Sequence, residues 1–281
     1  GEVIVGGVNV LKMSPSDLRE FRRHSISMVF QKFALLPNRT VLDNAVYGLE
    51  IQGLPRGRQV EIARGWLDRV GLKGYEGRYP NQLSGGMQQR VGLARALASD
   101  APILLMDEAF SALDPLIRMD MQSVLLDLQK EIRKTIVFIT HDLDEALRIG
   151  DRIAILRDGE VVQQGTRQEI VMSPADDYIA NFVKEVNRGR VISVEAIMRP
   201  FVRVKAGTML AVPMGTSLES AVKRLVEAGL DELVVTDSQG RPVGQLALKS
   251  IIATMVTSTV SEESQVVQLR TAAKATRLAE E

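Results

Sequence analysis

A serine followed by two glycines is the segment that most specifically suggests phosphate chemistry. Leu83-Ser84-Gly85-Gly86-Met87-Gln88-Gln89-Arg90 leads into an apolar stretch with helical spacing, Val91 to Ala98. Glycine has no Cβ, so its backbone N–H groups can approach a phosphate, and the N-terminus of a helix favours an anion. Ser-Gly-Gly is also a common turn, so this segment alone favours an ordinary helix start. The residues that follow it change this interpretation.

Two adjacent acids follow a short apolar stretch further along the chain. Ile103 to Met106 has the length of a buried strand, and Asp107 and Glu108 come directly after it. A carboxylate at the end of such a strand can hold Mg²⁺ on a nucleotide, and the next one can act as a general base toward water. The alternative is that the strand ends in ordinary solvated acids.

A glutamine and a histidine follow two further apolar stretches. Gln31 comes directly after Ile26 to Phe30, and His141 comes after Ile136 to Ile139. A neutral imidazole can position the attacking water or contact the γ-phosphate, and an amide can reach the metal and the water. Each residue alone is usually structural or solvated. The ordered series favours a phosphate site; its members are Gln31, Ser84 to Gly86, Asp107, Glu108, Asp114 and His141.

The elements that must position these residues alternate along the chain. Between the apolar stretches Ile103–Met106 and Ile136–Ile139, the segment Pro115–Arg133 has apolar residues on one helical face. Strand, helix and strand in this order predict two buried parallel strands with a right-handed crossover. The two acids and the histidine then lie at the carboxyl ends of neighbouring strands, where open α/β sheets bind ligands.

Other segments frame this α/β unit. Gly1 to Val10 has the pattern of two short strands around a Gly-Gly turn, and Ile153 to Val162 that of a hairpin. Val41 to Ala98 has helical spacing with Gly and Pro breaks, which predicts a helical subdomain at about 41–98. A boundary is predicted near Asn187 to Arg190, which gives the first domain residues 1–187.

Residues 191–256 are predicted to form a second, smaller α-β-β-α unit. Thr216 to Glu219 has capping-box spacing, and the helix that follows ends at Gly229. Two strands and a short helix come next: Glu232–Thr236, Val243–Ala247 and Lys249–Val256. The C-terminal tail, 257–281, is predicted to be a loose helix or disordered.

Composition limits the classes of function. The 281 residues are 45% hydrophobic and 25% charged, which fits one large or two modest globular domains. The 35 basic and 35 acidic residues cancel, so the chain has no overall field that would draw it to nucleic acid or an anionic membrane. The absence of cysteine excludes disulfides, Cys-ligated zinc and thiol catalysis. The sequence predicts neither a leader nor a membrane span of roughly 20 apolar residues, so a role at a membrane would require a partner.

Together the motifs resemble those of the nucleotide-binding subunits of ABC transporters, over roughly Gly1 to Lys184. The matching segments are the signature motif at Leu83 to Arg90, the Walker B strand at Ile103 to Glu108, the D-loop at Ser111 to Asp114, the Q-loop glutamine Gln31 and the switch histidine His141. The resemblance implies an α/β fold, a P-loop NTPase-like ABC cassette with a helical subdomain.

The resemblance also implies roles for single residues. Glu108 is expected to be the catalytic base and Asp107 the Mg²⁺ carboxylate, with Gln31 at the metal and the reacting water and His141 catalytic. Nucleotide contacts are expected from Ser84, Gly85, Gly86, Gln88 and Asp114. Of these, Ser84 to Gly86 would contact ATP bound on the opposite subunit of a head-to-tail dimer. The expected cofactors are ATP and Mg²⁺.

Two longer stretches narrow the resemblance. Met28 to Val41 and Glu108 to Arg118 are similar to importers of quaternary amines, the group that takes up glycine betaine, proline betaine and choline. Residues 191–256 are similar to a CBS domain, a small α+β unit that this group often carries. Ala247 and Ser250 stand where nucleotide-binding CBS units have a hydroxyl residue and an Asp. The unit is therefore expected to help two subunits associate or to sense ionic strength.

The resemblance implies a subunit on the cytoplasmic face of the inner membrane. Its expected partners are a second copy of the chain, transmembrane permease subunits that dock in a groove near Gln31 to Tyr47 and, indirectly, a substrate-binding protein. No nucleic acid is expected among the partners.

One motif of the family is missing. The Walker A loop, G-x-x-x-x-G-K-[ST], would precede the hairpin at Gly1 to Val10, and the chain contains no Gly-Lys dipeptide. We therefore expect a truncated copy that does not hydrolyse ATP at a normal rate by itself. Two alternatives stay open: a catalytically incompetent fragment with a regulatory role or no function, and a soluble ABC protein of translation or DNA repair.

Overall fold

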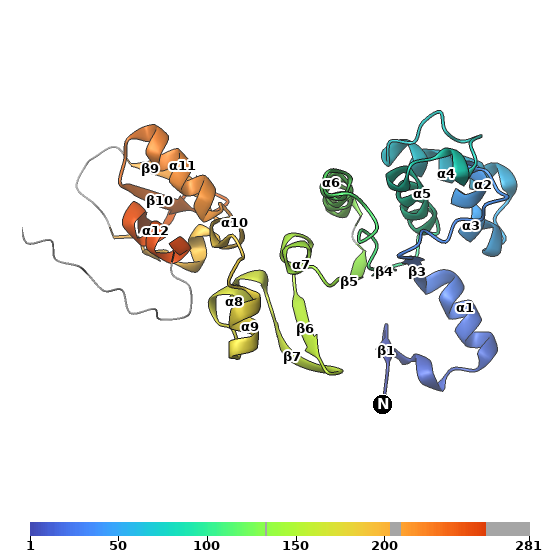
Figure 1. Cartoon of the computed structure of the whole chain (residues 1–281), viewed down its shortest axis with the longest axis horizontal. Helices are drawn as coiled ribbons and strands as arrows, with labels where there is room; N and C mark the ends of the chain where they lie inside the picture. Colours follow the sequence, from blue (N-terminus) through green and yellow to red (C-terminus); the bar gives the residue numbers. More distant parts are fainter. Residues whose placement is uncertain (133, 203–208, 257–281) are drawn as a thin grey trace, which may run out of the picture. The chain divides into compact units, whose positions relative to one another are not determined.

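The computed structural model describes residues 1–132, 134–202 and 209–256 (Figure 1). The chain divides into two compact units. The first is Gly1–Ile153, and the second begins at Ala154. This division comes earlier in the chain than the boundary predicted near Asn187 to Arg190. The predicted limits of the two domains therefore stay predictions, and the tail predicted at 257–281 lies outside the described residues. In the described ranges, no helix is both long and apolar enough to cross a membrane.

A three-stranded parallel sheet organises the first unit. Its order is β3-β4-β5, with β3 at Ile26–Val29, β4 at Ile103–Asp107 and β5 at Thr135–Ile139. Val29 lies opposite Met106, and Met106 lies opposite Phe138. The carboxyl ends of the three strands therefore come together at one end of the sheet, and the predicted parallel pairing is confirmed.

Helix α6 (Pro115–Glu131) connects β4 to β5. Asp114 caps its N-terminus and Pro115 occupies its first position, where the missing N–H costs no hydrogen bond. The face predicted from the sequence contains Met121, Leu125, Leu128 and Ile132. The first three are buried, whereas Ile132 follows the last helical residue and is only partly buried against the core.

The prediction that β5 is buried was wrong. Val137 and Ile139 are 48% and 55% exposed, whereas Ile136 and Phe138 pack against the core. Successive side chains of a strand point to opposite faces, so Ile136 and Phe138 face the core and Val137 and Ile139 face the opposite side of the sheet. One face of β5 is covered and the other is open, although both are apolar.

The segment predicted to be a helical subdomain is helical. Its elements are α2 (Val41–Ala45), α3 (Tyr47–Ile51), α4 (Arg56–Arg69), the 3₁₀ turn η2 (Pro80–Gln82) and α5 (Gly85–Ala98). In Figure 1 the four α-helices gather into one group. The buried face of α4 runs through Ala63 and Leu67 toward Val70, and the half-buried Ile62 and Trp66 lie at its margin.

The N-terminal region contains one predicted and one unpredicted element. β1 (Ile4–Val5) and β2 (Val8–Asn9) pair antiparallel around two glycines with positive φ, as the Gly-Gly turn predicted. After the 3₁₀ turn η1 (Val10–Lys12), α1 (Pro15–Ser25) was not predicted. None of its residues is buried, and its two half-buried apolar residues, Leu18 and Phe21, stand among charged ones, but its capping residue Ser14 is a readable start signal.

The predicted hairpin is present beyond α7 (Leu143–Ile149). It consists of β6 (Ile153–Arg157) and β7 (Glu160–Gly165), which form a two-stranded sheet. Short helical elements follow in the second unit: α8 (Arg167–Met172), α9 (Asp177–Phe182), α10 (Arg188–Val191) and η3 (Val194–Ala196).

The C-terminal part of the second unit is a four-stranded mixed sheet with two helices. Its order is β8-β11-β10-β9, with β8 at Arg199–Pro200, β9 at Leu210–Pro213, β10 at Glu232–Thr236 and β11 at Pro242–Ala247. The helices are α11 (Leu218–Ala228) and α12 (Leu248–Val256). The sequence predicted all of these except β8 and β9.

The start of α11 differs from the predicted capping box. Ser217, and not Thr216, is the capping residue, because its side chain accepts a hydrogen bond from the backbone N–H of Ser220. The predicted end is confirmed, since Gly229 has φ of 64° and is the left-handed residue that closes the helix.

Candidate active site

The candidate site lies where β3, β4 and β5 end. Gln31 follows β3, Glu108 follows β4 and His141 follows β5. Gln31 Nε2 donates a hydrogen bond to Glu108 Oε2 at 2.6 Å, and His141 Nε2 lies 2.7 Å from Glu108 Oε1. The structure therefore brings together the three residues that the sequence predicted to be catalytic.

Glu108 and His141 differ in exposure. The Glu108 side chain is 23% exposed and that of His141 is 86% exposed. A carboxylate with only partial access to water can still accept a proton from a water molecule that reaches it from the open side. The exposed imidazole can meet a ligand without rearrangement of the sheet.

The backbone at Glu108 has an unusual conformation. Its φ is +42°, which is uncommon for a residue other than glycine and is often found at functional sites. The N–H of Glu108 donates to the carbonyl of Ile139 at 2.9 Å, so the bonding between β4 and β5 continues one residue further. The Glu108 carbonyl accepts from Ser111 Oγ at 2.9 Å and from Ser111 N at 3.1 Å. These bonds hold Glu108 in its strained conformation.

Ser111 is a contact that the sequence analysis did not assign to the site. Gln31 Nε2 also approaches Ser111 Oγ at 3.4 Å, so the amide is shared between Ser111 and Glu108. The spacing of three residues between Glu108 and Ser111 is typical of a tight turn. This spacing was the feature of the sequence that could have indicated the contact between Ser111 and Glu108.

Asp107 is the last residue of β4 and lies opposite Ile139 on β5. Its carboxylate is half-buried and makes neither a hydrogen bond nor an ion pair with the described residues. The described ranges hold no cluster of three or more His, Cys, Asp or Glu side chains that could form a metal site. One or two carboxylates are what Mg²⁺ takes from a protein when phosphates supply its other ligands. The residues present therefore fit Mg²⁺ that arrives with a nucleotide.

The glycine segment forms the start of α5. Ser84 caps the helix by accepting from Met87 N at 3.4 Å, and Gln88 Nε2 donates back to the Leu83 carbonyl at 3.2 Å. No hydrogen bond or ion pair among the described residues joins this segment to Gln31, Glu108 or His141.

The close approach of Ile117 leaves room only for a glycine at position 86. A Cβ at this position would lie 2.5 Å from Ile117 Cγ2 on α6, so the two helices approach as closely as glycine allows. Asp114, also predicted to bind nucleotide, accepts a hydrogen bond from Ile117 N at 3.1 Å and caps α6. Both residues therefore have structural roles at the place where α5 and α6 meet.

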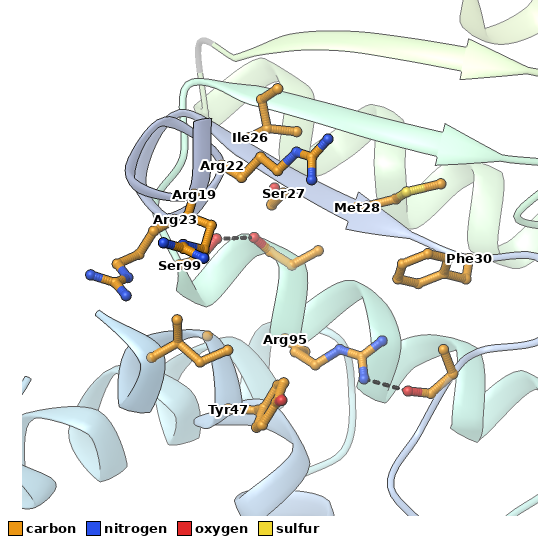
Figure 2. Close-up of a pocket in the computed structure, with 14 residues that line it drawn as sticks. Arg19, Arg22, Arg23, Ile26, Ser27, Met28, Phe30, Tyr47, Arg95 and Ser99 are labelled. Carbon is orange, nitrogen blue, oxygen red and sulfur yellow. Dashed lines mark hydrogen bonds between the residues drawn. The ribbon is translucent and has the colours of Figure 1, made fainter. Parts of the chain in front are cut away.

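A cavity of about 490 Å³ lies beside the segment that contains Gln31 (Figure 2). It is lined by residues of α1, β3, α3 and α5. Met28, Phe30 and Tyr47 provide apolar surface, and Arg22 and Arg95 provide positive charge. Ala34 and Tyr47, from the segment Gln31 to Tyr47 where the resemblance implied a groove, are among its lining residues.

Arg95 connects the cavity to the residues after Gln31. Its guanidinium donates to the Phe33 carbonyl at 3.0 Å and to the Ala34 carbonyl at 2.6 Å. Phe33 and Ala34 both have positive φ, 58° and 45°. Burial lowers the pKa of Arg95 from its usual value, but a guanidinium stays charged at neutral pH. Arg95 thus holds a strained segment between the cavity and the candidate site.

Comparison with known proteins agrees with this geometry. A family model described as ABC transporter matches residues 1–111. The glycine betaine transport ATP-binding protein OpuAA of Bacillus subtilis (strain 168) is 48% identical over 275 residues, 96% of this chain and 65% of that protein. This chain spans only 60 to 65% of the length of the glycine betaine transport proteins that it matches.

Two further relatives extend the comparison. The trimethylamine N-oxide transport system ATP-binding protein TmoW of Ruegeria pomeroyi is 45% identical over 88% of this chain and 71% of its own length. The dimeric, ADP- and Pi-bound structure of the ATP-binding cassette MJ0796 has a TM-score of 0.54 and 36% identity, and the match covers 59% of this chain and 73% of that one. Identity of this extent, together with the strand-end site, shows that the chain belongs to the ABC transporter family of ATP-binding proteins.

Proposed function

We propose that this chain serves in the ATP-hydrolysing subunit of an importer of quaternary amines such as glycine betaine, proline betaine or choline. The observation that carries the proposal is the Glu108 carboxylate held between Gln31 and His141 at the ends of three parallel strands. The substrate class is inferred from the similarity to OpuAA, which is a glycine betaine transport protein by name.

Glu108 acts in this proposal as the general base. Its carboxylate accepts a proton from the water that attacks the γ-phosphate of ATP, while Gln31 orients that water. His141, which is open to solvent, contacts the γ-phosphate and donates a hydrogen bond to the charge that develops there. The bonds from Ser111 fix the backbone of Glu108, so the base is in place before the reaction.

Asp107 and Gln31 are proposed to hold Mg²⁺ together with the phosphates of ATP. When bound, the ion neutralises charge on the transferred phosphoryl group. The Asp107 carboxylate makes no bond to the described residues, so its oxygens are available as ligands.

The start of α5 is proposed to bind the ATP of a second subunit. The backbone N–H groups at Ser84 to Gly86 and the positive end of the helix dipole favour a phosphate. Gln88 and Asp114 support this surface through the bonds that hold the starts of α5 and α6. A head-to-tail dimer is supported by MJ0796, which is dimeric in its ADP- and Pi-bound structure.

The cavity beside Gln31 is proposed as the docking site of a transmembrane permease subunit. Its apolar floor and the guanidinium groups of Arg22 and Arg95 suit an amphipathic segment with an acidic residue (Figure 2). Through the permease the chain would lie peripherally on the cytoplasmic face of the inner membrane, with a substrate-binding protein as an indirect partner.

The C-terminal sheet with α11 and α12 is proposed to be a CBS-like unit. The parallel pair β9 and β10 and the antiparallel pair β10 and β11 support this proposal. Ala247 at the end of β11 and Ser250 in α12 lack the carboxylate of nucleotide-binding CBS units. We propose that the unit helps two subunits associate.

Transport with labelled amines tests the proposal. A subunit that contains this chain together with a Walker A loop is produced with its permease and binding-protein partners in cells that lack other osmolyte carriers, and Glu108→Gln in this subunit is the comparison. We expect uptake of glycine betaine that Glu108→Gln abolishes, together with its phosphate release. Uptake that does not depend on Glu108 would refute the hydrolytic role, and failure to carry glycine betaine, proline betaine or choline would refute the substrate class. Because the sequence contains no Gly-Lys dipeptide, we expect the purified chain alone to release little phosphate.

A further inference from the structure

A series of hydrogen bonds joins helix α6 to the residues on either side of His141. We infer that this series orients His141 toward Glu108, and that Gln122, Glu145 and Thr140 are positioning residues for it. The inference rests on the proposed function only for its meaning in ATP hydrolysis, since the orientation of His141 can be measured without nucleotide.

The series runs from α7 through α6 to the His141 loop. Arg148 Nη1 donates to Gln122 Oε1 at 2.9 Å, and Gln122 Nε2 donates to Glu145 Oε1 at 2.9 Å. Thr140 Oγ1 donates to Glu145 Oε2 at 2.5 Å. Asp142 N donates to Thr140 Oγ1 at 3.0 Å. The residues before and after His141 are therefore both fixed by one series.

Burial makes this series resistant to local rearrangement. Gln122 and Glu145 are only 4% and 5% exposed. A buried carboxylate or amide that loses its partner cannot turn to water, so each broken bond would leave an unsatisfied polar group. The partners also fix the orientation of the Gln122 amide, because its oxygen faces a guanidinium and its nitrogen faces a carboxylate.

Arg118 provides a second attachment on the same face of α6. It precedes Gln122 by four residues, which places the two side chains one above the other. Its Nη1 lies 3.4 Å from Asp142 Oδ2, and its Nη2 donates to the carbonyls of Ser111 at 3.5 Å and Leu113 at 3.3 Å. Arg118 thus links the segment after Glu108 to the residue after His141.

The imidazole itself has little else to orient it. His141 is 86% exposed, and among the described residues its one ion-pair contact is with Glu108. The backbone sets the direction of the Cα–Cβ bond of His141, and the contact with Glu108 selects the position of the ring, so a shift at Thr140 or Asp142 moves Nε2 relative to Oε1 of Glu108. Arg118 bonds to Asp142, so the start of α6, where Ile117 meets Gly86 of α5, is connected to the residue after His141.

Imidazole ¹⁵N NMR spectra of the full 281-residue chain test the inference directly. The sequence has two histidines, so His24 serves as the internal reference. The Glu108→Gln variant removes the charge beside His141, and the resulting change in the His141 signal serves as the reference for the other variants. Thr140→Val keeps the shape of the side chain but removes the hydroxyl donor. We expect it to move the His141 signal by at least half of that change and to leave His24 unchanged, and Thr140→Ser to restore the original spectrum.

Ser123→Ala is the matched control. Ser123 follows Gln122 on α6, accepts from Arg148 Nη2 at 3.0 Å and donates to the Met119 carbonyl, but contacts neither residue beside His141. The His141 signal is expected to stay in place in this variant. An unchanged His141 signal in a folded Thr140→Val chain would overturn the inference. If Thr140→Val does not fold, Arg118→Met, at a position that is 30% exposed, replaces it, and an unchanged His141 signal in that variant would overturn the inference.

Kinetics separate this inference from the proposed function. In the assembled transporter we expect Thr140→Val to lower kcat for ATP hydrolysis by about tenfold or more with KM unchanged, because it affects a group that acts in the reaction. Equal phosphate release by wild type and Glu108→Gln would refute the proposed hydrolysis, whereas the spectra would still decide whether the series orients His141. An equal loss of kcat in Ser123→Ala would assign the effect to general destabilisation and would overturn the inference.

Discussion

Nε2 of His141 lies 2.7 Å from Oε1 of Glu108, although the His141 side chain is 86% exposed. We expect His141→Ala to lower phosphate release by the assembled transporter about 100-fold or more, because a group that acts on the reacting phosphate is lost. ATP binding and Tm are expected to change little, since an exposed side chain contributes little to the core. His24→Ala, at an exposed position of α1 beside Glu20, is the control and is expected to retain full activity. Full activity of His141→Ala would contradict the assigned role.

The contact between Gly86 and Ile117 predicts a coupled pair. Gly86→Ala places a Cβ 2.5 Å from Ile117 Cγ2, so we expect the free energy of unfolding to fall by about 1–3 kcal/mol. Ile117→Ala removes the obstructing methyl group. In the double variant the alanine at position 86 is expected to cost much less, which a double-mutant cycle in urea measures. Additive costs would show that the two side chains do not obstruct each other.

Asn44 is buried and fixes the loop that follows Gln31. Its Oδ1 accepts from Leu36 N at 2.7 Å, and its Nδ2 donates to the carbonyls of Leu36, Arg39 and Thr40. We expect Asn44→Ala to lower the free energy of unfolding by about 2 kcal/mol or more, because buried backbone groups lose their partners. Urea denaturation measures this, with the exposed Asn38→Ala as control. A loss as small as that of Asn38→Ala would contradict the prediction.

Asp43 predicts a pH dependence of stability. The hydrogen bond from Thr40, followed by that from Arg56, lowers the pKa of the Asp43 carboxyl from its usual 3.8. A carboxyl whose pKa is lower in the folded state stabilises the fold above pH 3.8, and this contribution is lost as the pH falls through the folded-state value. We therefore expect Asp43→Asn to lower Tm at pH 7 and the difference to shrink as the pH is lowered below about 4.

A control for this pH dependence is Asp127→Asn, an exposed position beside Lys130. Exposed ion pairs contribute little, so Tm should hardly change in this variant. A Tm difference between wild type and Asp43→Asn that stays constant from pH 7 to below pH 4 would show that the effect does not come from ionisation of Asp43.

Elements with buried apolar residues and clear turn residues at their ends could be predicted from sequence. Helix α6 and strand β10 are examples, because Met121, Leu125 and Leu128 of α6 and Leu233 to Val235 of β10 are buried. Helix α1 was missed although Ser14 caps its start, because the segment is rich in charged residues and none of its residues is buried. The exposure of one face of β5 was also missed, because both faces of this strand carry apolar residues.

Some residues of the candidate site could likewise be predicted from the sequence and others could not. Gln31, Glu108 and His141 could be predicted because each follows an apolar strand, and parallel strands bring such residues together. Gln122 and Glu145 could not, because a polar residue on a helix ordinarily faces solvent and their 23-residue separation gives no sign of contact. Their burial follows from how α6 and α7 meet, which the local pattern does not contain.

The positive φ of Glu108 also affects how this protein responds to selection for stability. Glycine adopts φ of +42° without strain, so Glu108→Gly would relieve about 1 kcal/mol or more of backbone strain while it removes the proposed base. A library screened only for expression level or thermal resistance would therefore enrich inactive chains at this position. At this position a gain in stability and the loss of the proposed base go together, so a more stable variant has to be selected on its turnover.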